Sequence, residues 1–307
     1  MRLNINEENQ KAGKKYGILG IVWDQGDING RSGSKYAPEK VKQCAERLIG
    51  RIQENKIFDV ENWRMLDLEN LSVKDYGLVK ELPVYDWMQA YEGMESAIRE
   101  IMEDGRKPII IGGDCSVNFP AVKAVHDMTE GKTGVIYMDA HFDTLSEDTW
   151  CGKYSHSSPL RNILDLPGVE ADHVVQFGVR GYVYPQFYEY AEETGYHVIH
   201  NTAFFEMGVD KTAEKILEKV TDGTERVMLC LDIDVLEGIF SPGSSCNESA
   251  GPSARELEAI VKKLAPYVDG ICITEINVMT DLNDITAMEG AKLMWDYIMN
   301  NYGGAEK

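Results

Sequence analysis

The stretch that organises this chain is Val135-Ile136-Tyr137-Met138-Asp139-Ala140-His141-Phe142-Asp143-Thr144. Its β-branched and aromatic first half predicts a buried strand. Because successive side chains of an extended backbone point to opposite faces, Asp139, His141 and Asp143 start out on one side. Carboxylates and imidazole are metal ligands, so this strand end predicts a metal site. Ordinary turn and cap roles are the alternative for a single triplet of this kind.

Two other apolar segments end in the same kind of side chain. Residues 227–231 lead into Asp232 and Asp234, and residues 107–111 lead into Gly112-Gly113-Asp114-Cys115-Ser116. In open parallel sheets the ligand crevice lies beyond the carboxyl ends of the strands. We therefore expect the three strand ends to point to one site.

The rest of the chain alternates strands and helices, which favours a parallel sheet with helices on both faces. The pattern predicts further strands at 16–22, 173–178 and 270–276, and helices at 38–53, 83–104, 118–129, 184–193, 211–220, 253–264 and 285–300. An apolar stripe on the longest helix, 83–104, includes Tyr85 and Met88 and predicts their burial. Ser253 and Glu256 predict a capping box at the start of a helix.

Three motifs carry a resemblance to a known family. In order and spacing, Gly112-Gly113-Asp114-x-Ser116, Asp139-Ala140-His141-x-Asp143 and Asp232-x-Asp234 resemble the signature motifs of the ureohydrolases, the arginases and agmatinases. The likeness covers most of the chain, from about Gly17 to Tyr297. It implies an arginase-type fold, a three-layer α/β/α sandwich around a central, mainly parallel sheet of about eight strands. No linker suggests a boundary, so we expect residues 1–307 to form a single domain.

The resemblance also implies two divalent metal ions. One ion would take Cys115, Asp139, Asp143 and Asp232, and the other His141, Asp139, Asp232 and Asp234, so that Asp139 and Asp232 bridge. Four carboxylates and one imidazole are too many for one ion with four ligands in all. They suit a pair of ions about 3.5–4 Å apart that activates a shared water. Manganese is the metal that such enzymes normally carry.

Cys115 departs from the family, which usually has His after Gly-Gly-Asp. A thiolate is a softer ligand, so zinc, iron or nickel stay open beside manganese. It also adds a negative charge to four carboxylates that already balance two divalent ions. Alternatively, Cys115 is a neutral thiol and one ion is weakly held or absent. The chain would then be a non-catalytic relative that binds a ligand or partner.

Two further segments resemble catalytic segments of the family. Ser155-His156-Ser157-Ser158-Pro159 is similar to the loop with a catalytic His, so His156 would pass a proton to a departing amine. Thr274-Glu275-Ile276-Asn277 is similar to the segment whose Glu grips a guanidinium, a planar cation that pairs well with a carboxylate. The alternatives are a loop histidine without a role and an ordinary carboxylate at a strand end.

The implied reaction is hydrolysis of a guanidino carbon–nitrogen bond in a small-molecule substrate, with release of urea and an amine. The amino-terminal loop at 24–34 and the segment around His156 favour an agmatinase-like activity, while another guanidino acid or formimidoylglutamate stays open. Glu147 and Asp148, in the loop before His156, are candidates for binding an amine on the substrate tail. Lys153 and Arg161, which lie close to His156 in sequence, are candidates for binding a carboxylate there.

Composition limits the other function classes. With 43% hydrophobic and 27% charged residues, the chain has the composition of an ordinary globular protein. A formal net charge of −20 argues against nucleic acid, because binding phosphates requires clustered Lys and Arg. No apolar run approaches the ~18 residues of a membrane span, and residues 1–8 carry no apolar signal core, so we expect a cytoplasmic protein. The family implies a homo-oligomer, a trimer or hexamer.

Six cysteines in 307 residues do not make a disulfide framework. We expect Cys44, Cys230 and Cys272 to pack as small apolar side chains in the core. Cys151 and Cys246 fall near the predicted site, and the sequence leaves their roles open.

Overall fold

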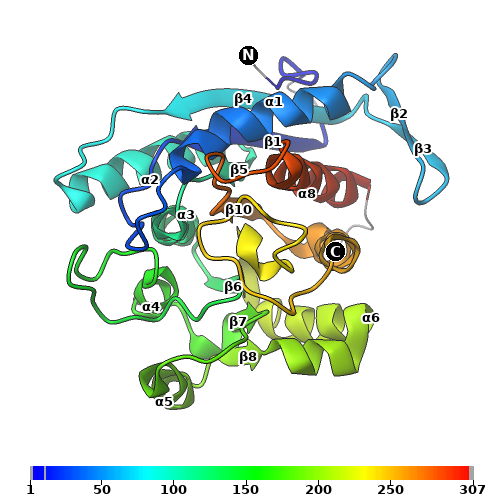
Figure 1. Cartoon of the computed structure of the whole chain (residues 1–307). Coiled ribbons are helices and arrows are strands. Elements are labelled where there is room, and N and C mark those ends of the chain that lie inside the picture. Colours follow the sequence, from blue (N-terminus) through cyan, green and yellow to red (C-terminus); the bar gives the residue numbers. More distant parts are fainter. Residues whose placement is uncertain (1–2, 10–11, 304–307) are drawn as a thin grey trace.

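The computed structural model describes residues 3–9 and 12–303, so Met1 and Arg2 of the amino-terminal segment lie outside the described residues. Within these ranges one sheet contains eight strands: β1 (Lys14–Ile21), β4 (Leu71–Val79), β5 (Lys107–Ile111), β6 (Lys132–Met138), β7 (Val174–Phe177), β8 (His197–Ile199), β9 (Thr224–Asp232) and β10 (Gly270–Thr274). Their order is β4-β1-β5-β10-β9-β6-β7-β8, and neighbouring strands are parallel (Figure 1).

The α-helices of the described residues are α1 (Ala37–Ile49), α2 (Trp87–Glu103), α3 (Asn118–Asp127), α4 (Pro159–Leu164), α5 (Pro185–Thr194), α6 (Asn201–Val220), α7 (Ala254–Leu264) and α8 (Ile285–Gly303). A separate antiparallel hairpin pairs β2 (Lys56–Asp59) with β3 (Arg64–Asp67). It projects beside α8 and away from the central sheet (Figure 1).

Helices cover both faces of the sheet, as the alternation of strand side chains requires (Figure 1). In β5, Ile109 and Ile111 join a hydrophobic cluster with residues of α1, α6, α7 and α8. Ile110, between them, joins a second cluster with residues of α2 and α3. The predicted parallel sheet with helices on both faces is therefore confirmed.

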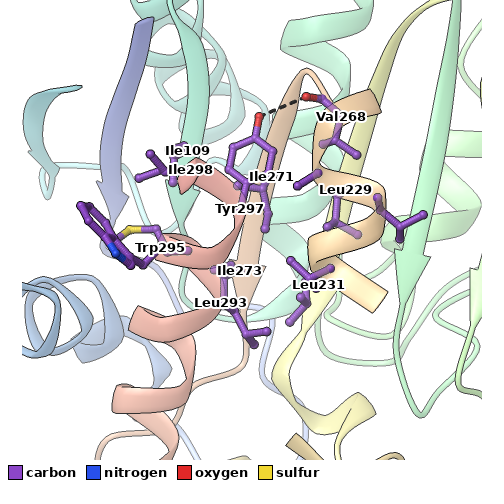
Figure 2. Packing of buried hydrophobic residues seen from close by; sticks show 14 of the residues in the cluster. Ile109, Leu229, Leu231, Val268, Ile271, Ile273, Leu293, Trp295, Tyr297 and Ile298 are labelled. Atoms are coloured by element: carbon purple, nitrogen blue, oxygen red, sulfur yellow. Dashed lines mark hydrogen bonds between the residues drawn. The ribbon is translucent and has the colours of Figure 1, made fainter. Parts of the chain in front are cut away.

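The last helix packs on the middle of the sheet. Figure 2 shows Leu293 and Tyr297 of α8 among Ile271 and Ile273 of β10, all of them fully buried. The hydroxyl group of Tyr297 donates a hydrogen bond of 3.2 Å to the carbonyl oxygen of Val268. Burying an apolar side chain of this size contributes roughly 1.5–3 kcal/mol, so this contact fixes the centre of the sheet firmly.

The longest predicted helix starts later than its apolar stripe suggested. Asp86 is the N-cap of α2 and its side chain accepts a hydrogen bond from the backbone of Gln89. Tyr85 therefore precedes the helix and is 98% exposed, while Met88 in the first turn is 54% exposed. The predicted burial of these two side chains was wrong, because the cap at Asp86 sets the start of the helix.

Other expectations for single elements are confirmed. Ser253 caps α7 and forms the predicted capping box with Glu256. Cys44, Cys230 and Cys272 are buried, and all six cysteines are free. In the part of the chain that the structure describes, no helix has the length and apolar character needed to cross a membrane.

Candidate functional site

Four neighbouring strands in the middle of the sheet deliver the predicted site residues to one edge. The order β5-β10-β9-β6 places their carboxyl ends side by side. Cys115 follows β5, Asp139 to Asp143 follow β6, Asp232 ends β9 with Asp234 just beyond, and Glu275 follows β10. The three strand ends singled out in the sequence therefore lie together, with a fourth between them.

Two groups of side chains could each hold a metal ion. In the first, ligand atoms of Cys115, Asp139 and Asp232 all lie within 4.8 Å of one another. In the second, the same holds for Asp139, His141 and Asp234. Asp139 is shared, which is the position of a bridging ligand. The two groups match the two predicted ligand sets without Asp143 in the first and without Asp232 in the second.

Asp143 lies beside these two groups but belongs to neither of them. Its side chain accepts a hydrogen bond of 2.7 Å from the hydroxyl group of Tyr137, and its backbone has a φ of 52°. A positive φ is strained for a residue with a side chain and is often found at functional sites. Tyr137 is a site residue that the sequence analysis missed, although it lies in the stretch that organises the chain.

Backbone hydrogen bonds fix the carboxylates. One oxygen of Asp139 accepts from the backbone of His141 at 2.6 Å, and Asp232 accepts from the backbone of Asp234 at 2.7 Å. Nδ1 of His141 lies 3.1 Å from Asp234. The other oxygen of Asp139, Oδ2, is buried and has no hydrogen-bond partner among the described residues. An orphaned carboxylate oxygen inside a cluster of acids fits a bound cation.

The electrostatics of the cluster also fit a cation. Burial, and then the charge of Asp234, raise the pKa of Asp139 to about 6. Burial and neighbouring carboxylates raise the pKa of Asp143 and of Asp232 well above the usual range. Burial alone would lower the pKa of His141, but Asp234 and Asp139 raise it well above its ordinary value. Buried carboxylates this close together need positive charge to remain ionised.

Cys115 connects the acid cluster to Glu275. Its Sγ lies 2.6 Å from an oxygen of Asp232, and its backbone N–H donates to Oε1 of Glu275 at 2.9 Å. Burial, together with the nearby carboxylates, raises the pKa of the Cys115 thiol well above its ordinary value. The thiol thus occupies the place that the sequence predicted for a metal ligand.

The other residues of the Gly-Gly-Asp motif have structural roles. Asp114 accepts hydrogen bonds from the backbone of Gly26 at 2.6 Å and of Ser116 at 2.9 Å, which ties the loop after β1 to the end of β5. A Cβ atom on Gly113 would overlap the carbonyl oxygen of Trp23. Only glycine permits this close approach of two backbones.

His156 and Glu275 form a buried pair at the same cavity. Nδ1 of His156 lies 3.4 Å from Oε1 of Glu275. Burial alone would lower the pKa of His156, but the hydrogen bond and charge of Glu275 raise it to about 9. Oε2 of Glu275 is buried without a hydrogen-bond partner among the described residues, and the residue has a φ of 61°.

Asn29 is a second residue that the sequence analysis missed. Its Nδ2 lies 3.3 Å from Nε2 of His156 and 2.8 Å from Sγ of Cys246. The signal was the glycine-bearing loop at 24–34, which the sequence marked without showing that it reaches over the site. Cys246 therefore lines the cavity, while Cys151 lies 3.5 Å from the carbonyl oxygen of Gln25.

These side chains surround a cavity of about 340 Å³. Its lining includes Cys115, His141, Asp143, His156, Asp232, Asp234, Cys246 and Glu275. The four charged residues that the sequence offered for a substrate tail, Glu147, Asp148, Lys153 and Arg161, do not line it. The guanidinium of Arg161 instead lies 4.1 Å from the ring centroid of Tyr190.

Comparison with known proteins gives a consistent result. Residues 14–299 match the sequence profile of the Arginase family. A guanidinopropionase of Pseudomonas aeruginosa is 28% identical over 289 residues, which cover 94% of this chain and 86% of the relative. An agmatinase of Neisseria meningitidis is 27% identical over 295 residues, or 95% of this chain and 89% of the relative.

The fold is shared with solved structures. The crystal structure of formimidoylglutamase from Bacillus subtilis superposes with a TM-score of 0.83 at 24% identity, covering 94% of this chain and 88% of that one. At this identity the likeness concerns the fold. It agrees with the three-layer α/β/α arrangement around an eight-stranded parallel sheet found among the described residues.

Proposed function

The chain belongs to the arginase family of hydrolases that act on linear amidines, and we propose that it cleaves a guanidino carbon–nitrogen bond with release of urea and an amine. The resemblance of the three motifs to the ureohydrolases is confirmed by the family match. The observation that carries the proposal is one cavity that combines two overlapping groups of metal-ligand atoms with the buried pair His156 and Glu275.

A pair of divalent ions fits the donor set. Cys115, Asp139 and Asp232 would hold one ion with Asp143 beside them, and His141, Asp139 and Asp234 would hold the other with Asp232 beside them. When bound, such a pair supplies positive charge to the carboxylates and makes a water molecule more acidic. Oxygen and imidazole donors suit manganese, while the sulfur of Cys115 keeps zinc, iron and nickel as alternatives.

Glu275 is placed to orient the substrate. Its Oε1 is occupied by the backbone of Cys115, and its buried Oε2 has no partner among the described residues. A guanidinium group offers planar N–H donors that match a carboxylate. Glu275 would therefore accept from the guanidinium and hold its carbon near the shared carboxylate, Asp139.

His156 is placed to carry a proton. Its Nδ1 faces Glu275 and its Nε2 faces Asn29, so both ring nitrogens are held. In the reaction an oxygen from water bonds to the guanidinium carbon and the bond from this carbon to the substituted nitrogen breaks. That nitrogen needs a proton to leave as an amine, and His156 would supply it.

Between the alternatives, we favour a substrate without a carboxylate, in line with an agmatinase-like reaction, over a guanidino acid such as guanidinopropionate. The reason is that no Lys or Arg among residues 3–9 and 12–303 lines the cavity. A carboxylate on the substrate would enter a space that already contains several carboxylates, and like charges in a buried site repel strongly. A substrate without a carboxylate, as in an agmatinase-like reaction, avoids this repulsion.

The test combines metal content with urea release. Protein purified without chelators should contain about two divalent ions per chain and should release urea from at least one guanidino compound. The compounds should carry amine, carboxylate, amino-acid or uncharged tails. Less than one ion per chain, and no turnover after addition of Mn, Zn, Fe or Ni, would mean that the proposal is wrong.

A variant separates proton transfer from metal binding. His156→Asn should lower kcat by about 10²–10⁴-fold because the leaving amine loses its proton donor, while the metal content stays unchanged. His197→Asn is the matched control, since His197 does not line the cavity. Wild-type kcat in His156→Asn would remove this residue from the mechanism.

A further inference from the structure

The cavity lining also contains apolar and aromatic side chains, which we call the apolar wall: Ile28, Phe142, Leu145, Val183, Tyr184 and Phe187. The rings of Phe142 and Phe187 are stacked, with centroids 5.8 Å apart and an interplanar angle of 5°. Phe142 lies between His141 and Asp143, so this wall begins directly beside the proposed reaction centre.

No Lys or Arg among residues 3–9 and 12–303 lines this cavity. The guanidinium of Arg180 lies beside the acid cluster and donates hydrogen bonds to the backbone carbonyl groups of Asp234, Val235 and Leu236. Further donors of Arg180 reach Gly178, Glu248 and Ser249. Because its guanidinium is committed to the backbone, it has little capacity left for a substrate carboxylate.

A substrate amine also finds no partner at the apolar wall. The acids that line the cavity are Asp143, Asp232, Asp234 and Glu275, and all of these have proposed roles at the metal ions or the guanidinium. Glu248, whose carboxylate lies 4.0 Å from Nε2 of His141, is partly exposed and does not line the cavity. A charged tail of either sign would meet no oppositely charged partner at the apolar wall, whereas an apolar tail would bury its surface against it.

We infer that the substrate is a guanidine with an uncharged, apolar tail, alkyl or aryl, which packs on the stacked rings of Phe142 and Phe187. This inference rests on the proposed hydrolysis and specifies its substrate class. Water contributes the oxygen of urea, the bond between the guanidinium carbon and the tail nitrogen breaks, and the tail leaves as a protonated apolar amine. No oxidant or reductant is required.

The first experiment compares tails of similar length. n-Butylguanidine, agmatine and 4-guanidinobutyrate differ mainly in having an uncharged, a positive or a negative end. With the protein as purified, kcat/KM for urea release and Kd by calorimetry should favour n-butylguanidine by about tenfold or more. Ethylguanidine should bind about fifteenfold more weakly than n-butylguanidine, because it lacks two methylenes and each buried methylene tightens binding about fourfold. Equal or better binding and turnover of either charged compound would overturn the inference.

Urea release tests the proposed hydrolysis, and the order of the Kd values tests the apolar tail. Urea from agmatine or 4-guanidinobutyrate alone would leave the hydrolysis in place and overturn the apolar tail. If none of the compounds yields urea, the proposed hydrolysis fails. The order of the Kd values still decides the tail in that case, since binding to the cavity wall does not require turnover.

A charge placed in the wall makes the test sharper. Phe187→Arg should raise the ratio of kcat/KM for 4-guanidinobutyrate over n-butylguanidine by about tenfold or more, because the added cation pairs with the carboxylate. Val183→Arg tests the same wall from a more exposed position, should Phe187→Arg fail to fold. Tyr188→Arg is the control, because Tyr188 is exposed on α5 but does not line the cavity. An unchanged ratio in both wall variants would show that the tail does not lie there.

Discussion

Cys115 is the residue at which we expect this chain to depart from the ureohydrolase motif. It lies between Asp232 and Glu275, so it connects the proposed metal centre to the proposed guanidinium contact. A thiol at this point changes both the charge and the softness of the first ligand group. The metal preference of the protein should therefore depend on this side chain more than on any other in the group.

Replacement of Cys115 should change the metal content in a predictable way. Cys115→Ser should bring the chain from about two ions to about one, because serine is a poor ligand when neutral, and kcat should fall at least tenfold. Cys115→His should raise the affinity for manganese relative to zinc or iron, because imidazole is the harder ligand. Elemental analysis after dialysis against each metal measures both effects.

The control for these variants is Cys151→Ser, which removes a thiol outside both groups of ligand atoms. If Cys115→Ser bound as much metal as the wild type, Cys115 would not be a ligand.

Single residues of the site could be predicted from the sequence where they are close together in the chain. Asp139, His141 and Asp143 could be predicted because they follow one strand at alternate positions. Asn29 and Phe187 could not be predicted, since Asn29 reaches the cavity from a loop 127 residues away from His156, and Phe187 from a helix that is also distant in sequence from Phe142. Only the packing of the sheet brings such residues together.

Among single elements, β6 carries a tight contact that depends on a glycine. A Cβ atom on Gly134 would overlap the carbonyl oxygen of Val220 at the end of α6. Gly134→Ala should lower the free energy of unfolding by about 1–3 kcal/mol, because backbone atoms cannot move aside as a side chain can. Urea unfolding measures the loss.

Gly13→Ala provides the comparison for Gly134→Ala. A Cβ atom at Gly13 would have no neighbour within 4 Å among the described residues, so the free energy of unfolding should change by less than about 0.5 kcal/mol. Equal stability of the two variants would contradict the close approach of α6 to β6.

Helix α8 carries a carboxylate that should make stability depend on pH. Burial, and then the charge of Glu258, raise the pKa of Glu289 from 4.5 to about 7, although Lys292 opposes this. One of its oxygens is buried without a hydrogen-bond partner among the described residues. Because the folded pKa lies above the unfolded one, this contribution is present below pH 4.5 and is lost as pH rises through about 7.

Glu289→Gln should therefore be more stable than the wild type at pH 8, by at most about 3 kcal/mol, and should lose this advantage towards pH 5. Urea unfolding at both pH values measures the difference. Glu46→Gln, on the exposed surface of α1, controls for the change in net charge. A constant difference between the Glu289 variant and the wild type across this range would exclude the buried carboxylate as its cause.

The elements themselves were predicted best where the apolar pattern was strongest. The central strand β5 has the bounds that the sequence indicated, because all of its side chains except the first are buried. The edge strands β4 and β8 were missed, since a strand with a partly exposed pattern resembles a loop in sequence. Gly208, with a φ of 74°, interrupts α6, and the sequence therefore showed only its second half.

For the whole molecule, we propose that residues 1–307 behave as one domain. Strand β10 pairs with β5 on one side and with β9 on the other, so the sheet is continuous through its centre. The metal-free protein should therefore unfold in a single transition, with the same midpoint by circular dichroism and by tryptophan fluorescence. Two separate midpoints would indicate two domains. A trimer or hexamer and a cytoplasmic location stay predictions of the family resemblance and of the composition.

The position of β10 also determines when the site can exist during synthesis. Strands β4, β1 and β5 form one half of the sheet, and β9, β6, β7 and β8 form the other, with β10 between them. A nascent chain that has emerged from the ribosome only as far as β9 holds two half-sheets without the strand that joins them. Glu275 follows this joining strand, so the cavity is completed only after β10 has left the ribosome.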